Sequence, residues 1–110
     1  MTRMWGLSPE LLCDRHLLGE HAELHQLVGT VENHPHGEAI VRGHAAKGNV
    51  DTRLIEERHA TLVAELENRG FAHDSPLSYD ADLEIGAIDE RANRAELADR
   101  CAACRERIEG

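Results

Sequence analysis

The sequence has little of several residue types, and each shortage excludes a class of protein. Its 110 residues include one Phe, one Tyr and one Trp, and no apolar run exceeds four residues. We therefore expect neither a membrane-spanning helix nor a secretory leader, and we predict a cytoplasmic monomer without membrane contacts. Three cysteines are too few, and odd in number, for a disulfide framework, so reduced thiols are expected.

Positive charge is also scarce. Twelve Lys and Arg residues stand against 21 Asp and Glu residues, which gives a formal net charge of −9. This balance argues against a protein that holds nucleic acid by bulk positive charge. The charge is uneven, however, because residues 1–55 carry a net −2 and residues 56–110 a net −7. Arg3, Arg15 and Arg42 can still form a local basic patch, so DNA remains a candidate partner, with weak non-specific binding.

Helix signals dominate, and alternating strand patterns are absent. Ser8 and Pro9 mark the start of a first helix that runs to Gly29, and its leucines fall on nearly every side, as in a central helix. Further elements are expected as helices at about 38–47, 51–69 and 89–107 and a polar loop at 71–90. We predict an all-α fold, a single compact domain over residues 1–110, with a central N-terminal helix crossed by two or three further helices.

The chain begins Met1-Thr2-Arg3, and removal of Met1 before a small residue would free the α-amine of Thr2. An α-amine titrates far closer to neutrality than a lysine side chain, and a neighbouring Arg favours its neutral form. A neutral amine can attack an electrophilic carbon and form an imine. Thr2 is therefore a candidate nucleophile.

His16, Glu20 and Glu23 share one sector of the first helix, at positions i, i+4 and i+7. Polar groups on a mostly covered helix need partners or a task. An ordinary solvated helix face has the same spacing, so the pattern alone leaves both interpretations open.

Chain length gives a geometric test of this sector. Residues 2–8, if extended, reach about 20–25 Å, and the helix rises about 21 Å from Pro9 to Glu23. The N-terminal segment can therefore run antiparallel to the helix and bring the Thr2 amine near Glu23, with Trp5 packed midway. An amine beside a carboxylate is the arrangement that imine chemistry at a sugar C1′ requires.

Two stretches of the sequence carry recognisable motifs. They are Met1-Thr2-Arg3, Asp14, His16-Leu17, Glu20 and Glu23-Leu24 in the first, and Arg58-His59, Leu62-Val63-Ala64-Glu65 and Arg69-Gly70-Phe71 in the second. These pieces, over roughly residues 1–31 and 55–75, resemble the pyrimidine-dimer DNA glycosylase family, whose phage member is also called endonuclease V. The chain looks like a shorter, acidic branch of that family.

The resemblance implies a DNA repair glycosylase with AP lyase activity on damaged or modified double-stranded DNA, without a cofactor. The Thr2 amine would attack C1′ of the damaged nucleotide, displace the base and form an imine, and Glu23 would stabilise the cationic sugar and assist proton transfers. β-Elimination would then nick the strand. DNA contacts near the lesion are assigned to Arg3, Trp5, Arg15, His16 and Glu20, although Trp5 can equally serve as a core anchor.

The chain also departs from the family. Ala22 and Gln26 stand where the phage enzyme has two arginines that grip the duplex, and Cys101-Ala-Ala-Cys104-Arg-Glu-Arg replaces an aromatic, basic C-terminal segment. The reaction class is therefore a firmer expectation than the lesion. The alternatives are a non-catalytic all-α module that binds DNA or a protein, and a small zinc-stabilised interaction domain.

Cys101 and Cys104 are half of a zinc site at most, because a complete site needs a second pair of ligands. The only plausible donors in the sequence are His34, His36 and Cys13. On one face of the predicted last helix, the two thiols are expected to act as small buried hydrophobes, with no metal.

Overall fold

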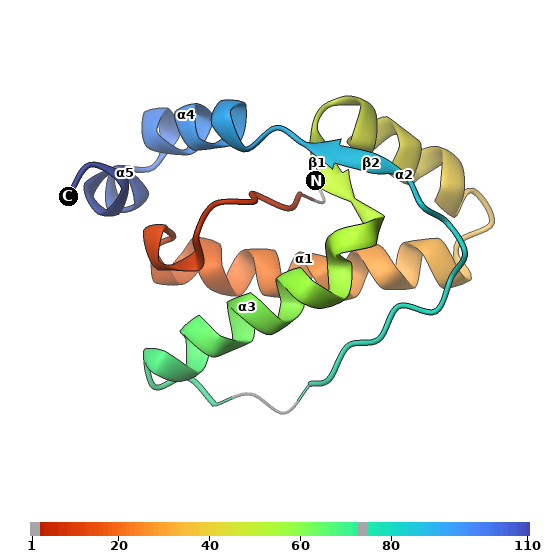
Figure 1. Ribbon diagram of the computed structural model, residues 1–110, viewed down its shortest axis with the longest axis horizontal. Coiled ribbons are helices and arrows are strands. Elements are labelled where there is room, and N and C mark those ends of the chain that lie inside the picture. The colour runs from red at the N-terminus through yellow and green to blue at the C-terminus, as the bar shows by residue number, and fades with distance from the viewer. Residues whose placement is uncertain (1–2, 73–74) are drawn as a thin grey trace.

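The structure, a computed structural model, describes residues 3–72 and 75–110 (Figure 1). Its helices are α1 (Asp14–Asn33), α2 (Gly37–Ala46), α3 (Ile55–Asn68), α4 (Glu90–Arg100) and α5 (Ala102–Glu109). Strands β1 (Asn49–Asp51) and β2 (Gly86–Ile88) pair antiparallel, and 3-10 turns at Pro9–Leu11 and Thr52–Leu54 come before α1 and α3. The predicted all-α class is confirmed, with one small sheet added.

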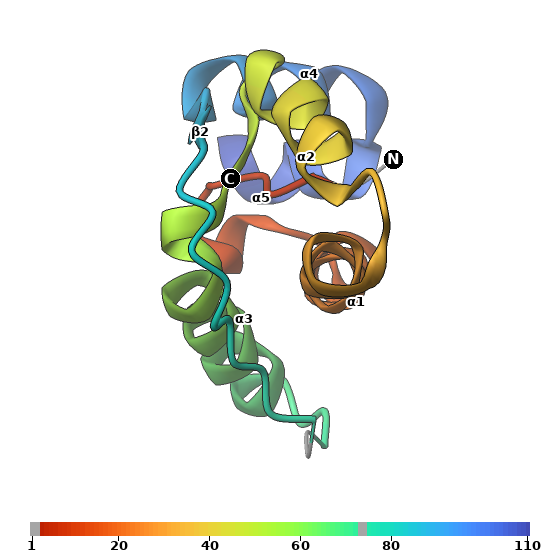
Figure 2. The ribbon, with the colours of Figure 1, turned by 90° about the vertical axis from the view of Figure 1, so that its right-hand side faces the viewer.

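The extended N-terminal segment, residues 3–8, lies between two groups of helices. Figures 1 and 2 show α1 and α3 on one side of it and α2, α4 and α5 on the other. Met4 donates its backbone N–H to the carbonyl of Asn49 at 2.7 Å, and the Asn93 amide donates to the carbonyls of Met4 and Trp5. Met4 and Leu7 are fully buried. The segment is therefore an inner strip of the core, and it runs antiparallel to α1 as the length argument predicts.

Helix α1 begins later than predicted and has an exposed face. Leu11 and Leu12 belong to the preceding turn, so the leucines that made the helix look covered on all sides are not all part of it. The residues that α1 buries are one-sided, at Leu17, Glu20, Leu24, Leu27 and Val28, and Leu18 is 41% exposed. The expected end at Gly29 is also wrong, because the helix continues to Asn33.

The predicted last helix is two helices. The backbone is extended at Cys101 (φ −132°, ψ 108°), which ends α4 and caps α5 by accepting the N–H of Cys104 at its sulfur. The apolar spacing continues through this break, so the pattern predicted one helix. Because Cys101 lies in the link between the helices and Cys104 in α5, the two thiols do not share one continuous helical face.

The small sheet was not predicted, because strands of three residues are too short to show alternation. Asn49 pairs with Ile88, and Asp51 pairs with Gly86. Gly86 has φ of +125°, and a Cβ there would lie 2.1 Å from the carbonyl oxygen of Val50. Only glycine allows this close approach.

A buried ion pair joins α3, α1 and the N-terminal segment. Arg58 of α3 donates to both carboxylate oxygens of Glu20, at 2.6 and 3.0 Å, and to the carbonyl of Leu7 at 2.6 Å. The Glu20 side chain is fully buried, and that of Arg58 is 10% exposed. The planar guanidinium fork fixes the relative position of the three elements.

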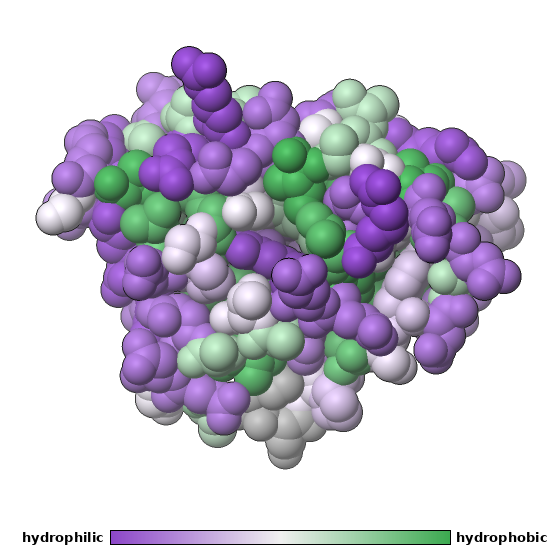
Figure 3. Space-filling view, viewed as in Figure 1, coloured by the Kyte–Doolittle hydropathy of each residue, from purple (hydrophilic) through white to green (hydrophobic). Residues whose placement is uncertain are grey.

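Polar residues cover most of the face that Figure 3 shows, as expected for a chain rich in charge. Within the described ranges, no helix is both long and apolar enough to cross a membrane.

We expect Arg58→Met to lower the free energy of unfolding by about 3–5 kcal/mol, because it leaves the Glu20 carboxylate buried without a cation. The double variant Glu20→Met/Arg58→Met should recover much of this loss, because two apolar side chains need no partner. Urea unfolding of both variants measures the difference. A single variant as stable as the unmodified protein would contradict the role of the pair.

Candidate active site

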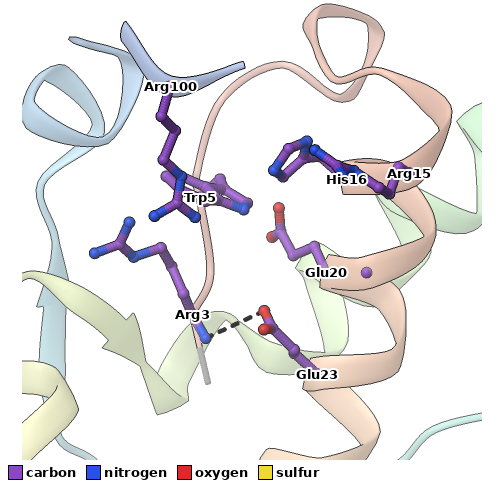
Figure 4. Close-up of a pocket in the computed structure, with 8 residues that line it drawn as sticks. Arg3, Trp5, Arg15, His16, Glu20, Glu23 and Arg100 are labelled. Carbon is purple, nitrogen blue, oxygen red and sulfur yellow. Dashed lines mark hydrogen bonds between the residues drawn. The ribbon is translucent and has the colours of Figure 1, made fainter. Parts of the chain in front are cut away.

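A cavity of about 370 Å³ opens between the N-terminal segment, α1 and the end of α4 (Figure 4). Its lining residues are Arg3, Trp5, Arg15, His16, Gly19, Glu20, Glu23 and Arg100. The sector at His16, Glu20 and Glu23 thus faces a cavity and is not an ordinary solvated face. All five residues predicted to contact DNA line this cavity.

Glu23 is the carboxylate nearest the start of the described chain. Its Oε2 accepts the backbone N–H of Arg3 at 3.3 Å, which Figure 4 draws as a dashed line. Burial raises the pKa of Glu23, and the hydrogen bond from Arg3 opposes this rise. Thr2, the predicted nucleophile, lies outside the described residues. Arg3, the next residue, meets Glu23, as expected for an N-terminal segment that runs antiparallel to α1.

Glu20 lies in a different environment from Glu23, although only three residues separate them. Both of its oxygens are occupied by Arg58, and its side chain has no exposed surface. Glu20 thus forms part of the wall of the cavity with its charge already paired. The predicted DNA contact at this residue stays a prediction, and the visible role of Glu20 is to hold Arg58.

Two arginines and a tryptophan form the wall opposite α1. The guanidinium carbons of Arg3 and Arg100 lie 4.5 and 5.0 Å from the centre of the Trp5 ring, within cation–π range. Both arginines also pair with Glu96. Trp5 is 3% exposed, which is the burial of a core residue, and its ring meets His16 edge-on at 5.9 Å.

Arg100 is a lining residue that the sequence reasoning missed. It comes from α4, far along the chain, and nothing in its local sequence distinguishes it from the other arginines of the C-terminal half. Arg42 of the predicted basic patch instead pairs with Glu38 on α2 and does not line the cavity. Ala22 and Gln26 are both exposed on α1 outside the cavity.

Among residues 3–72 and 75–110, two clusters of side chains have atoms close enough to hold a metal ion. Cys13, His16, Cys101 and Cys104 form the first, with ligand atoms that all lie within 4.8 Å of one another. Burial raises the pKa of the Cys104 thiol to about 12, while the backbone N–H of Cys104 lowers the pKa of Cys101. Cys13, one of the predicted additional ligands, belongs to this cluster. The histidine in it is His16, and not the predicted His34 or His36.

The second cluster consists of three imidazoles, His21 and His25 from α1 and His59 from α3. Their ring centres are 4.9–5.2 Å apart. His59 is buried, and the other two are partly exposed. No functional role was predicted for these residues.

The family model described as pyrimidine dimer DNA glycosylase matches residues 2–79, which is more than half of the chain. The chain belongs to the pyrimidine dimer DNA glycosylase family. The resemblance drawn from the N-terminal motifs is therefore confirmed, and with it membership of a family of DNA repair enzymes. No significant match exists among curated proteins or solved structures.

The residues that line the cavity fall partly inside and partly outside the region that matches the glycosylase family. Seven of the eight described residues that line the cavity, from Arg3 to Glu23, lie inside the matched region, whereas Arg100 lies beyond it. The cavity thus combines family-matched residues with one arginine from α4.

The raised pKa of Glu23 gives a stability prediction whose sign can be worked out. The folded state binds this proton more tightly than the unfolded chain, so the ionised carboxylate lowers stability above the folded pKa, and the cost disappears below the unfolded pKa. We expect Glu23→Gln to leave the Tm equal or higher at pH 7, with the difference gone near pH 4. Thermal unfolding at both pH values measures this. Glu32→Gln, an exposed change on the same helix, is the control, and a lower Tm for Glu23→Gln at pH 7 would contradict the prediction.

Proposed function

We propose that the chain is a DNA glycosylase with AP lyase activity that uses the α-amine of Thr2 as nucleophile and Glu23 as its assisting carboxylate. The observation that carries this proposal is the 3.3 Å hydrogen bond from the Arg3 backbone to Glu23. Consecutive Cα atoms are about 3.8 Å apart across a trans peptide. We therefore expect the Thr2 amine, one residue before Arg3, to lie within reach of this partly desolvated carboxylate.

In the first step, the amine nitrogen bonds to C1′ of the damaged nucleotide, and the glycosidic C1′–N bond breaks, so that the base leaves. The nitrogen then loses its protons as the C1′–O4′ bond opens and O4′ is protonated, which gives the imine. The negative Glu23 stabilises the positive charge that develops on the sugar. Its raised pKa suits a group that also accepts and returns protons.

In the second step, removal of a proton from C2′ drives cleavage of the C3′–O3′ bond, and the 3′ phosphate leaves with the electron pair. Water then hydrolyses the imine and frees the enzyme. The imine acts as the electron sink, so no metal or organic cofactor is needed for either bond cleavage. The substrate class is duplex DNA with a damaged or modified base, and the pyrimidine dimer named by the family is the first lesion to test.

The composition makes the nucleophile unusually easy to identify. The mature chain has two kinds of primary amine, its N-terminus and the side chain of Lys47, its single lysine. Lys47 is exposed at the end of α2 and does not line the cavity. Imine formation in this cavity is therefore expected at the N-terminus.

We expect sodium borohydride to trap a covalent complex between the untagged protein and duplex DNA that holds an abasic site or a pyrimidine dimer. Lys47→Arg should trap as well as the unmodified chain, whereas acetylation of the α-amine should abolish trapping and strand cleavage together. Gel shift under denaturing conditions and peptide mapping of the adduct measure this. No trapping with any abasic substrate by a protein that still binds the duplex would favour the non-catalytic module.

Glu23→Gln should abolish strand cleavage while the protein stays folded, because the amide cannot carry negative charge or move a proton. The matched control is Glu32→Gln, which should cleave normally, since Glu32 is exposed on α1 away from the cavity. Single-turnover cleavage of an abasic duplex measures the difference. Equal rates for the two variants would contradict the assignment of Glu23.

Gly19 offers a test of the cavity as the binding site. A Cβ at Gly19 would meet nothing within 4 Å, and the residue lies inside α1, where glycine costs about 0.5–1 kcal/mol relative to alanine. Gly19→Ala should therefore raise stability and keep cleavage, whereas Gly19→Leu should keep the fold and lower cleavage by filling the cavity. Cleavage rates and Tm are measured together, and equal cleavage by the two variants would exclude this cavity as the site.

A further inference from the structure

The cluster at Cys13, His16, Cys101 and Cys104 draws on three parts of the chain. Cys13 and His16 lie at the start of α1, Cys101 links α4 to α5, and Cys104 lies in the first turn of α5. Their ligand atoms converge, with 3.2 Å between Cys13 Sγ and His16 Nδ1, 3.5 Å between Cys104 Sγ and His16 Nδ1, and 3.9 Å between Cys13 Sγ and Cys101 Sγ.

These separations match the edges of a zinc tetrahedron. Tetrahedral bonds of about 2.3 Å to sulfur and 2.0–2.1 Å to nitrogen place two sulfurs roughly 3.8 Å apart and a sulfur and nitrogen roughly 3.5 Å apart. The three contacts given above lie within about 0.3 Å of these values, and all four ligand atoms lie within 4.8 Å of one another. A small shift of the side chains is enough to bring all four atoms onto one ion.

The backbone around the sulfurs is arranged as in thiolate sites. The N–H of Cys104 points to Cys101 Sγ at 3.4 Å, and the N–H of Cys13 points to Cys104 Sγ at 3.3 Å. Such donors stabilise the negative sulfur and fix its orientation toward a metal. Cys101 and Cys104 are also buried, which favours a closed, structural ion over one that keeps a water ligand.

We propose that Cys13, His16, Cys101 and Cys104 bind one structural Zn²⁺ ion, which joins the C-terminal helices to the start of α1. The three thiols release their protons to solvent on binding, and the neutral imidazole binds through Nδ1. The resulting charge of −1 lies beside Arg15 and Arg100, each adjacent in sequence to a ligand. This proposal does not depend on the proposed reaction.

The ion would have a consequence for the cavity. His16 is both a ligand and a lining residue, and Arg100 directly precedes the ligand Cys101. Ligation therefore fixes two lining residues, one on each wall. It also ties the part of the chain beyond the family match to residues within it.

We expect the untagged protein, expressed with zinc in the medium, to contain one zinc per chain by plasma mass spectrometry. Cobalt exchanged into the protein should give the visible bands of a tetrahedral ion and the near-ultraviolet charge transfer of thiolate ligands. X-ray absorption should show three sulfur neighbours and one nitrogen. Removal of the ion should make three thiols reactive and speed amide exchange in α4 and α5 by tenfold or more.

Variants separate this site from the imidazole cluster. Cys104→Ser should lose zinc, His16→Cys should keep it because a fourth thiolate can replace the imidazole, and His25→Asn, in the other cluster, should not change it. If Cys104→Ser does not fold, the cobalt spectrum and thiol count of the unmodified protein still decide the matter. Three reactive thiols with less than about a tenth of a zinc per chain after zinc is supplied, a disulfide between two of the cysteines, or zinc lost only in His25→Asn would each overturn the proposal.

Discussion

The hydrogen bonds that the Arg58 guanidinium donates are the interaction on which the rest of the structure depends. The guanidinium bonds Glu20 on α1 and the carbonyl of Leu7 in the N-terminal segment, and it comes from α3. A buried carboxylate and a buried carbonyl both need donors, and one rigid fork supplies them together. The extended segment is therefore held along α1, and Arg3 reaches Glu23 at the far end. The position of Arg3, the residue that follows the proposed nucleophile, thus depends on an ion pair that has no role in the proposed reaction.

Helix α1 carries two glutamates whose different surroundings suit them to different roles. Glu20 is fully buried and bidentate with Arg58, so its charge is permanently compensated. Glu23, one turn further, accepts one backbone hydrogen bond, and burial raises its pKa. Environment, and not residue type, thus separates the structural carboxylate from the one suited to proton transfer.

Capping residues and terminating glycines act on the backbone next to them, so the sequence alone predicts the structure around them. Asp51 accepts the N–H of Arg53 and caps the 3-10 turn before α3, so the helix begins at Ile55 and not at the predicted residue 51, while Gly70 follows its end with φ of +89°. The antiparallel course of the N-terminal segment followed from length alone. Glu20 and Arg58 are 38 residues apart, however, and no spacing rule connects them.

The missed features share a long-range cause. The helix break at Cys101 occurs where its sulfur meets Cys13 and the N–H of Cys104, contacts that the apolar spacing does not reveal. Arg100, which lines the cavity, is the last residue of α4 and lies directly before this break. The motif Cys101-x-x-Cys104 shows only one pair of thiols, so the sequence predicts at most half of a zinc site. The fold brings the other candidate ligands to this pair from the start of α1.

The net charge of −9 constrains how such a cavity can meet DNA. Its arginines are Arg3, Arg15 and Arg100, and the first and last already share Glu96. At most about three phosphate contacts would release few counterions, so the logarithm of affinity should fall with the logarithm of salt with a slope of about −3 or less steeply. Non-specific binding is then weak. With the proposed function, we expect recognition to come instead from the low cost of unstacking a damaged nucleotide and from the fit of the displaced nucleotide in a cavity lined by Trp5 and Glu23.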